Sequence, residues 1–445
     1  MMKIAIIGTG YVGVTTGIAF AKHNFNVVCV DKIKEKIESL NNGIASFYEP
    51  GLNKMLKKLV NKGLLKGSIN LEKTVKNSNT SFICVGTLSL PNGSVSLEYV
   101  KDVAKDIGKA LEKKKGYHLV VVKSTVIPLT TEKIVLPIIE KYSGKKAGKD
   151  FGICMNPEFL KEGDALNDAL HPDRIVIGEY DKKSGNVLMK LYKGFKCRKV
   201  RTNLRTAEMI KYASNSFLAT KIMFANEMAN ICEKFGIDVY KVMKSVGLDK
   251  RISPYFLNAG CGFGGSCFKK DISAIVCAAK SKGYESKILE TILEMNETQP
   301  LHLIRMTESV LGNLKNKKIA LLGLSFKPDT DDVRETRALP IAKTLLKKGA
   351  KIVAYDPKAM NNFKKLVRHK NIVYAKSGRD ALKNADACII QSDWKEFKKL
   401  GINDFRTMKK QIIIDGRRTF TDKNIDGFVK NKITYLGIGW KYNKF

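Results

Sequence analysis

Residues 3–31 read KIAIIGTGYVGVTTGIAFAKHNFNVVCVD, and this stretch decides the fold of the first part of the chain. Residues 3–7 are a short apolar run, residues 8–13 are a glycine-rich turn, and a helical pattern then continues to about His23. A second apolar run follows and ends at Asp31. Strand, glycine turn, helix, strand and acid, in this order, predict the first half of a doubly wound parallel sheet.

The glycine-rich turn has the spacing of a dinucleotide-binding loop. Gly8 permits the tight turn, Gly10 lets the backbone approach a pyrophosphate, and Gly13 lets the helix pack closely on the strand. The N-terminus of the helix then faces the phosphates. Asp31 stands at a strand end, where a carboxylate binds a ribose hydroxyl and repels a 2′-phosphate, so we expect NAD rather than NADP. Lys32 and Lys36 lie close enough along the chain to weaken that preference.

The rest of the chain alternates in the same way, with one interruption. Apolar runs at residues 80–85, 119–122 and 152–155 each end in polar or Gly/Pro signals, as parallel strands with ligand loops at their carboxyl ends should. Residues 206–235 lack Pro and Gly and keep helical spacing, which predicts one long helix. Strand-like runs resume at 318–322, 351–355, 387–390 and 411–414. The prediction is an α/β protein with two doubly wound, Rossmann-like domains (1–200 and 312–445) joined by a central helical domain (201–311).

Composition restricts the class of protein. The chain has 44% hydrophobic and 27% charged residues, which is typical of a soluble globular protein, and it has no apolar run of 18 or more residues, so we expect no membrane span. Its nine cysteines are scattered and form no C-x-x-C pair, which indicates a protein of the reducing cytoplasm. The cysteines and the five histidines do not have the spacing of a zinc site, so we expect no metal.

The net charge of +36 allows three interpretations: nucleic-acid binding, attraction of an anionic small substrate, and a lysine-rich solvated surface. The lysines are spread along the chain and are not gathered into a stripe with aromatic residues. We therefore expect no specific nucleic-acid binding, although the charge should steer nucleotide anions toward the protein.

A second glycine-dense segment, GFGGSCFKKD at residues 262–271, places the Cys267 thiol just before a predicted helix. The helix N-terminus and the adjacent Lys269 and Lys270 would favour thiolate over thiol. Together with the dinucleotide loop, a nucleophilic cysteine indicates oxidation through a covalent intermediate. Taken alone, a cysteine beside glycines is more often structural.

Other polar residues follow predicted strands or share a helix face. Glu158 and Glu162 follow the strand that ends near residue 155, where they are either a general acid/base pair or ordinary loop acids. Lys211 and Asn215 lie four apart on the long helix, so they share a face that suits an oxyanion, or they form a simple polar stripe.

Two further segments belong to the second α/β domain. Lys327 and Arg334 follow its first strand and are either anion contacts or part of a charged turn. Arg417 follows another strand, where an arginine suits bidentate binding of phosphate or carboxylate.

Seven motifs, in order, resemble the UDP-glucose/GDP-mannose dehydrogenase family nearly from end to end. They are GTGYVG (8–13), YEPGL (48–52), KSTV (123–126), NPEFLKEG (156–163), HPDRIVIG (171–178), GFGGSCFKKD (262–271) and LGLSFKPDTDDVRET (322–336). So many ordered motifs are far more specific than the nucleotide loop alone.

The resemblance implies a four-electron oxidation of a sugar primary alcohol to a carboxylate with two NAD molecules, here UDP-glucose to UDP-glucuronate. The first oxidation gives an aldehyde, Cys267 attacks it, a second hydride leaves the thiohemiacetal, and water hydrolyses the thioester. The same reaction on GDP-mannose or a UDP-N-acetylhexosamine is the alternative. A single-hydride 3-hydroxyacid dehydrogenase or a non-catalytic nucleotide- or nucleic-acid-binding protein would leave Cys267 without a role.

The resemblance also implies residue roles. The implied catalytic residues are Cys267 (nucleophile), Glu158 (proton donor and acceptor), Lys211 and Asn215 (oxyanion), and Thr125 and Asp271 (water). The implied cofactor contacts are Gly8, Gly10, Tyr11, Val12, Gly13, Asp31, Lys36, Thr87, Ser124, Thr125, Glu162, Lys270 and Arg334. The implied UDP-sugar contacts, expected between the domains, are Glu158, Phe159, Leu160, Lys161, Glu162, Lys211, Asn215, Arg251, Phe256, Asn258, Phe263, Gly264, Phe326, Lys327 and Arg417.

The resemblance implies a homodimer or higher homo-oligomer formed through the long central helix, with Arg251 reaching a neighbour's sugar site. The three domains would then bind NAD, dimerise and bind the UDP-sugar, as expected of a cytoplasmic enzyme of polysaccharide biosynthesis. Four positions depart from the family pattern. Lys269 stands where Pro or Gln is usual, Ile127 and Leu129 replace Pro and Gly after KSTV, and Leu88 replaces a common Pro. These departures affect loop shape rather than the chemistry.

Overall fold

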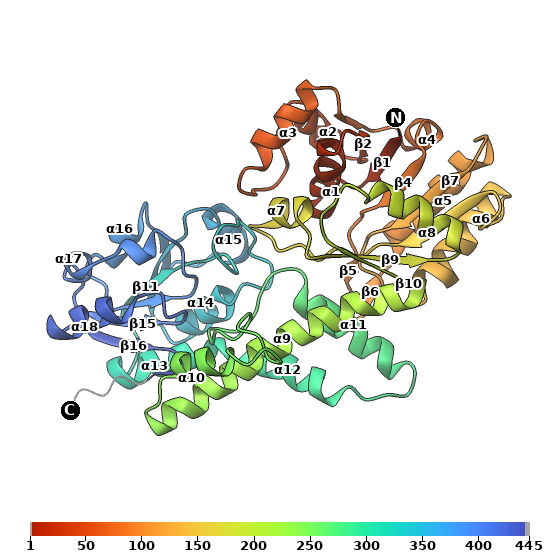
Figure 1. Cartoon of the computed structure of the whole chain (residues 1–445). Helices are drawn as coiled ribbons and strands as arrows, with labels where there is room; N and C mark the ends of the chain where they lie inside the picture. Colours follow the sequence, from red (N-terminus) through yellow and green to blue (C-terminus); the bar gives the residue numbers. More distant parts are fainter. Residues whose placement is uncertain (1, 441–445) are drawn as a thin grey trace. The chain divides into compact units, whose positions relative to one another are not determined.

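The computed structural model describes residues 2–440 and divides into two compact units (Figure 1). The first unit runs up to Ser214 and includes Cys277–Lys282. The second unit holds Asn215–Val276 and the residues from Gly283 onward. These two units differ from the three domains expected from the sequence, with boundaries at residues 200/201 and 311/312. The three-domain division stays a prediction.

The first unit is built on an eight-stranded sheet with the order β10-β9-β8-β7-β4-β1-β2-β3. The strands are β1 (Lys3–Ile7), β2 (Asn26–Val30), β3 (Leu65–Ser68), β4 (Thr80–Ile83), β7 (His118–Val122), β8 (Phe151–Met155), β9 (Arg174–Glu179) and β10 (Arg198–Asn203). Neighbours are parallel except β8 and β9, which are antiparallel. Every residue of β7 and β8 is buried, as expected for central strands covered on both faces.

Helices cover both faces of this sheet. They are α1 (Tyr11–Lys22), α2 (Lys34–Asn41), α3 (Leu52–Asn61), α4 (Leu71–Lys76), α5 (Glu98–Glu112), α6 (Leu136–Ser143), α7 (Ala165–Leu170) and α8 (Lys182–Leu191), with a π-helical turn at Thr131–Val135 and a small hairpin of β5 (Leu88–Ser89) and β6 (Val95–Ser96). Because strand side chains alternate, Ile4 and Ile6 of β1 enter one core, with α1 and α3, while Ile7 enters the other, with α5 and α6. The predicted doubly wound arrangement is therefore confirmed.

The second unit carries a six-stranded, all-parallel sheet with the order β13-β12-β11-β14-β15-β16. Its strands are β11 (Lys318–Leu322), β12 (Lys351–Tyr355), β13 (Ile372–Tyr374), β14 (Ala387–Ile390), β15 (Ile412–Asp415) and β16 (Thr434–Gly437). Its helices are α14 (Ala338–Lys347), α15 (Met360–Leu366), α16 (Gly378–Leu382), α17 (Ile402–Phe405) and α18 (Asp422–Lys430), with a 3-10 turn at Phe397–Lys399. This is the 3-2-1-4-5-6 strand order of a Rossmann sheet, although the sequence here lacks G-x-G-x-x-G.

A helical region lies between the two sheets in sequence. It consists of α9 (Leu204–Phe235), α10 (Val239–Val246), α11 (Phe268–Lys280), α12 (Lys287–Thr298) and α13 (Pro300–Leu311). The predicted long helix is confirmed as α9, which has 32 residues, begins in the first unit and continues into the second. Within residues 2–440, no helix combines the length and the apolar character that crossing a membrane would require.

Candidate active site

The dinucleotide loop connects β1 to α1, and its glycines are needed for different reasons. Gly8 has φ +105°, and a Cβ there would lie 2.6 Å from the carbonyl oxygen of Cys84. A Cβ on Gly13 would overlap the carbonyl oxygen of Gly8, whereas one on Gly10 would meet nothing within 4 Å. Gly10 therefore borders open space at the N-terminus of α1, and the loop fits a pyrophosphate.

Asp31 follows β2, and Thr9 from the dinucleotide loop holds its carboxylate. Oδ2 of Asp31 accepts hydrogen bonds from the backbone N of Thr9 (3.1 Å) and from its Oγ1 (2.6 Å), and Oδ1 accepts from Ile33 N (3.1 Å). Burial opposes ionisation of Asp31, but these hydrogen bonds and the charge of Lys36 outweigh it and lower its pKa. Lys32 lies over the ring of Tyr99. Thr9 was not predicted as a site residue. Its hydroxyl, between the first two glycines of the loop, was a sequence signal for a hydrogen bond to the acid after the second strand.

The loops after β4 and β7 meet at the carboxyl edge of the sheet, where several of the predicted cofactor residues lie. Ser124 Oγ donates to Val85 O (2.6 Å), and Thr87 Oγ1 donates to the carbonyl oxygen of Thr125 (3.1 Å). Tyr11, in the first turn of α1, packs its ring on Phe47, and Val12 follows it in the same turn.

The loop that follows Thr125 contains Leu129, one of the four positions that depart from the family pattern. Leu129 has φ +79°, the left-handed conformation that glycine adopts without strain. The buried Glu208 of α9 holds this turn, because its carboxylate accepts from Leu129 N and Thr131 N, both at 2.7 Å. Burial raises the pKa of Glu208 to about 7. Neither Glu208 nor its role was predicted.

Glu158 and Lys211 form a buried ion pair in the first unit. Lys211 Nζ lies 2.9 Å from Glu158 Oε1, and the two side chains are 4% and 8% exposed, respectively. Leu160 N donates to Glu158 Oε2 (2.6 Å). Burial opposes ionisation of Glu158, but the charge and hydrogen bond of Lys211 outweigh it, so its pKa is lowered and the carboxylate is a proton acceptor.

Lys123, the first residue of the KSTV motif, lies close enough to this pair to interact with both charges. No role was predicted for it. Its Nζ donates to Asn156 Oδ1 (2.9 Å), which also accepts from Tyr192 OH (2.6 Å). Burial lowers the pKa of Lys123 to about 8. These residues, with Glu158 and Phe159, line a cavity of about 60 Å³. A lysine directly after the fully apolar part of β7 was a signal for this buried cation.

The segment at residues 156–163 is anchored from the YEPGL motif. The buried carboxylate of Glu49 accepts from Gly163 N and Ala165 N, both at 2.8 Å. Lys161 pairs with Asp168 (3.1 Å) and Asp164 (3.6 Å). The sequence motif YEPGL therefore has a structural role that its residue types alone did not indicate.

Cys267 is half-buried and directly precedes α11, as predicted. Its carbonyl oxygen accepts the first helical hydrogen bond, from Asp271 N (2.8 Å). A Cβ on Gly264 would lie 2.6 Å from Glu335 O, and one on Gly265, at φ +79°, would lie 2.9 Å from the ring of Phe326. The glycines before Cys267 thus let its loop approach the segment after β11 closely.

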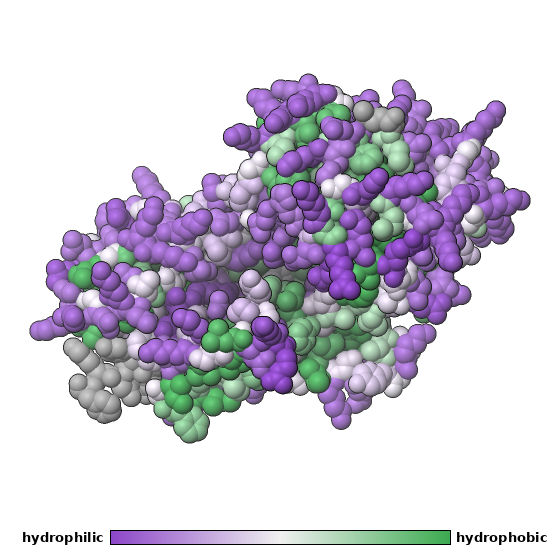
Figure 2. Space-filling view, in the orientation of Figure 1, coloured by the Kyte–Doolittle hydropathy of each residue, from purple (hydrophilic) through white to green (hydrophobic). Residues whose placement is uncertain are grey.

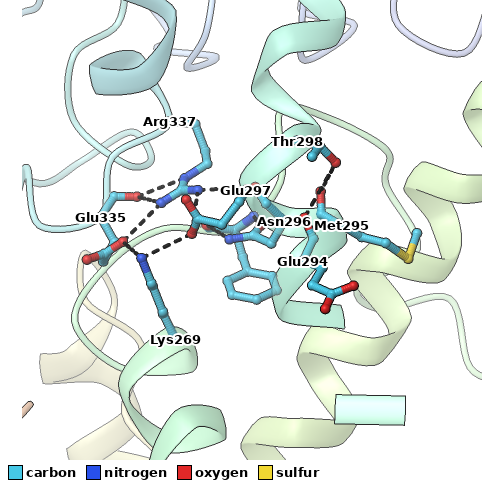
Figure 3. Close-up of polar contacts among 9 residues, drawn as sticks. Lys269, Glu294, Met295, Asn296, Glu297, Thr298, Glu335 and Arg337 are labelled. Carbon is cyan, nitrogen blue, oxygen red and sulfur yellow. Dashed lines mark hydrogen bonds and ion pairs between the residues drawn. The ribbon is translucent and has the colours of Figure 1, made fainter. Parts of the chain in front are cut away.

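Asp271 connects α11 to α9 within the second unit. Its Oδ2 accepts from Asn215 Nδ2 (2.6 Å), and Lys270 Nζ lies 2.6 Å from Oδ1. Lys269 pairs with two carboxylates (Figure 3). Both lysines next to Cys267 are therefore paired with acids, and the N-terminus of α11 is a further favourable influence on the thiolate.

The predicted UDP-sugar residues are divided between the units. Residues 158–162 and Lys211 lie in the first unit, and Asn215, Arg251, Phe256, Asn258, Phe263, Gly264, Phe326, Lys327 and Arg417 lie in the second. Arg417 donates to the carbonyl oxygens of Gln391 (3.0 Å) and Gly262 (3.3 Å). Arg251 is exposed and pairs with Asp249.

Arg334, predicted to contact the cofactor, lies in the second unit and pairs with Asp332 at 2.7 Å. In the part of the chain described, 2–440, no cluster of three or more His, Cys, Asp or Glu side chains is placed to hold a metal ion. The roles of the predicted site residues stay predictions.

Comparison with known proteins identifies the family. Residues 2–196, 205–298 and 320–422 match the NAD binding, central and UDP binding domains of the UDP-glucose/GDP-mannose dehydrogenase family. The chain is 44% identical to the UDP-glucose 6-dehydrogenase TuaD of Bacillus subtilis (95% of this chain, 90% of TuaD) and 42% identical to AglM of Haloferax volcanii, also a UDP-glucose 6-dehydrogenase (94% and 97%).

Solved structures agree with these sequence relatives. A UDP-glucose dehydrogenase from Pyrobaculum islandicum is 37% identical with a TM-score of 0.90 (99% of this chain, 98% of that one). A UDP-D-ManNAc dehydrogenase from Pyrococcus horikoshii is 28% identical with a TM-score of 0.86 (98% and 99%). With all three family domains matched in order, the chain belongs to the UDP-glucose/GDP-mannose dehydrogenase family.

Proposed function

We propose that this chain is an NAD-dependent UDP-glucose 6-dehydrogenase, which oxidises the primary alcohol of UDP-glucose to the carboxylate of UDP-glucuronate. The observation that carries the proposal is the half-buried Cys267 at the N-terminus of α11, in a chain whose first domain binds NAD. Relatives named for UDP-glucose are 37–44% identical over nearly the whole chain. A UDP-N-acetylhexosamine is the second candidate substrate, favoured by the structural similarity to the UDP-D-ManNAc enzyme.

The dinucleotide loop would hold NAD, which would supply the hydride acceptor for both oxidations. Gly10 would leave space for the pyrophosphate of NAD, and the ionised Asp31 would accept hydrogen bonds from its ribose. We assign Tyr11, Val12, Lys36, Thr87, Ser124, Glu162, Lys270 and Arg334 to the same cofactor as predictions from the family pattern.

The first oxidation requires the sugar hydroxyl to lose its proton. Glu158 is ionised and therefore able to accept a proton, directly or through water. Lys211 and Asn215 each present N–H donors, which stabilise negative charge on the sugar oxygen. The aldehyde that results stays bound.

Cys267 then makes the second oxidation possible. Its thiolate attacks the aldehyde carbon, forming a C–S bond and a thiohemiacetal, and loss of the second hydride gives a thioester. Water attacks the thioester carbonyl, the C–S bond breaks, and the thiolate is regenerated with the carboxylate product. In this proposal Asp271 and Thr125 orient that water. One sugar consumes two NAD and one water.

The proposal extends to assembly and location. On α9 the exposed side chains of Phe217, Phe224 and Ile231 recur every seven residues, which places them on one face of the helix. Figure 2 shows apolar side chains gathering over α10 and the adjoining part of α9. These features support a homodimer formed through the central domain, residues 201–311. In this proposal residues 1–200 are the NAD-binding domain and residues 312–445 are the UDP-sugar-binding domain. The nine free cysteines support a cytoplasmic enzyme, which would supply polysaccharide biosynthesis.

An NADH-coupled assay with separate nucleotide sugars tests the function. UDP-glucose should give two NADH per sugar, and a ratio of one would reject the four-electron reaction. Faster turnover of UDP-N-acetylglucosamine or GDP-mannose would select the alternative substrate. Cys267→Ala should abolish formation of the acid, whereas the control Cys277→Ala, within α11, should retain it.

A further inference from the structure

Four charged side chains form an ion-pair network beside the Cys267 loop, all within the second unit (Figure 3). Lys269 Nζ lies 3.0 Å from Glu297 Oε1 and 3.0 Å from Glu335 Oε2. Arg337 lies 3.2 Å from Glu335 Oε2 and 3.6 Å from Glu297 Oε1. Two cations and two carboxylates balance in charge, and they join the first turn of α11, the last turn of α12 and the segment between β11 and α14.

Arg337 is the fixed member of this network, since its side chain is only 3% exposed. Its guanidinium also donates to the backbone oxygens of Glu335 (3.0 and 2.9 Å) and of Asn296 (3.1 Å). The end of α12 and the segment before α14 are therefore bound to each other without Lys269. Lys269, which is 38% exposed, adds α11 to this frame.

The same frame holds the loop on the other side of Cys267. The side chain of Asn296 accepts from Phe263 N (2.7 Å) and donates to Phe263 O (3.1 Å). Gly265 N donates to the carbonyl oxygen of Arg334 (2.9 Å), the residue before Glu335. Cys267 thus lies between two attachments to one frame: the loop at Phe263 and Gly265, and the helix at Lys269.

We propose that Lys269 is a positioning residue, which holds the first turn of α11 so that the Cys267 thiolate can reach the aldehyde. Its charge is balanced by Glu297 and Glu335, so it acts by fixing geometry rather than by stabilising the negative charge on sulfur. The Pro or Gln usual at this position in the family cannot form an ion pair, so the attachment is a feature of this chain. The inference rests on the proposed function.

The test uses Lys269→Met, which keeps the length of the side chain and removes its charge. Cys267 acts only after the aldehyde has formed, so rapid-mixing measurements should show formation of the first NADH within about twofold of the unsubstituted enzyme. Formation of the second should slow about threefold to tenfold, since small misplacements of a reacting group are costly. The KM for UDP-glucose should stay within about twofold, and Lys269→Arg should restore the second step.

The matched control is Lys348→Met. Lys348 pairs with Glu308 at 2.7 Å and is 40% exposed, so this change removes a similar ion pair between other helices. It should leave both NADH steps unchanged. Equal slowing of both steps by Lys269→Met, or no slowing of the second, would overturn the proposal.

Two measurements separate positioning from charge and from a wrong substrate. Iodoacetamide labelling of Cys267, read by peptide mass spectrometry with Cys277 as internal reference, should keep its pH midpoint in Lys269→Met. A higher midpoint would mean that Lys269 acts directly on the thiol and would overturn the proposal. Hydrogen exchange over residues 262–271 should be faster in Lys269→Met whichever sugar is oxidised, and unchanged exchange would contradict the positioning role.

Discussion

Replacing Lys211 with methionine leaves the Glu158 carboxylate buried without its closest cation. The two charged atoms lie 2.9 Å apart with side chains that are almost completely buried. At that distance and an effective dielectric constant of about 20, their attraction is about 6 kcal/mol, which the desolvation of both groups offsets in large part. Removing one partner of such a pair costs about 3–5 kcal/mol, and Lys123 nearby favours the lower value.

The loss of stability in Lys211→Met should depend on pH. In the unsubstituted protein the folded pKa of Glu158 is lowered, so the pair stabilises the fold above the ordinary pKa of 4.5, and this contribution is lost as pH falls through the lowered value. In the variant, burial is no longer opposed by Lys211, so we expect the pKa of Glu158 to be higher than in the unsubstituted protein. The penalty then grows as pH rises through that higher value. The difference between the two proteins should therefore be largest near about pH 7–8 and shrink on acidification.

Urea unfolding offers an assay with an internal control. Both tryptophans of the chain, Trp394 and Trp440, lie in the second unit, so their fluorescence reports that unit, whereas far-UV circular dichroism reports both. Lys211→Met should shift the dichroism transition of the first unit and leave the fluorescence transition in place. The double variant Lys211→Met/Glu158→Gln removes both charges and should regain most of the lost stability. A loss that is independent of pH, or a double variant as unstable as the single one, would refute this reasoning.

Two further predictions concern cofactor binding and assembly. Asp31→Ala should raise the KM for NAD about tenfold to a hundredfold, because hydrogen bonds to a charged group are lost. Steady-state kinetics should show a nearly constant KM for UDP-glucose. The reverse pattern would mean that the cofactor site is misplaced. Phe217→Glu combined with Phe224→Glu places two charges on the apolar face of α9, so sedimentation velocity should show a monomer, and an unchanged dimer would place the interface elsewhere.

Local features of the chain were predictable from sequence because local geometry determines them. Gly8, Gly10 and Gly13 follow a strand and open a helix. Backbone shape alone requires Gly8 and Gly13, whereas Gly10 leaves open space at the N-terminus of the helix. The unbroken helical spacing of residues 206–235 predicted α9, and the glycine-dense segment at residues 262–267 predicted that Cys267 directly precedes a helix. The alternation of apolar runs with helical stretches likewise predicted two parallel sheets. The second sheet is parallel throughout although it carries no glycine fingerprint, and the first departs from this only where β8 and β9 pair antiparallel.

The partners of charged groups were decided only by the tertiary structure. Nothing in the sequence pairs Asn215 with Asp271, 56 residues away, or pairs Lys269 with Glu297 and Glu335. A periodic pattern states which face a side chain occupies, whereas a pKa depends on the few ångströms between a charge and its partner and on the water excluded around them. The sequence by itself therefore determined the sheets, the long helix and the reactive groups, and the folded packing determined which of those groups are paired, buried and ionised.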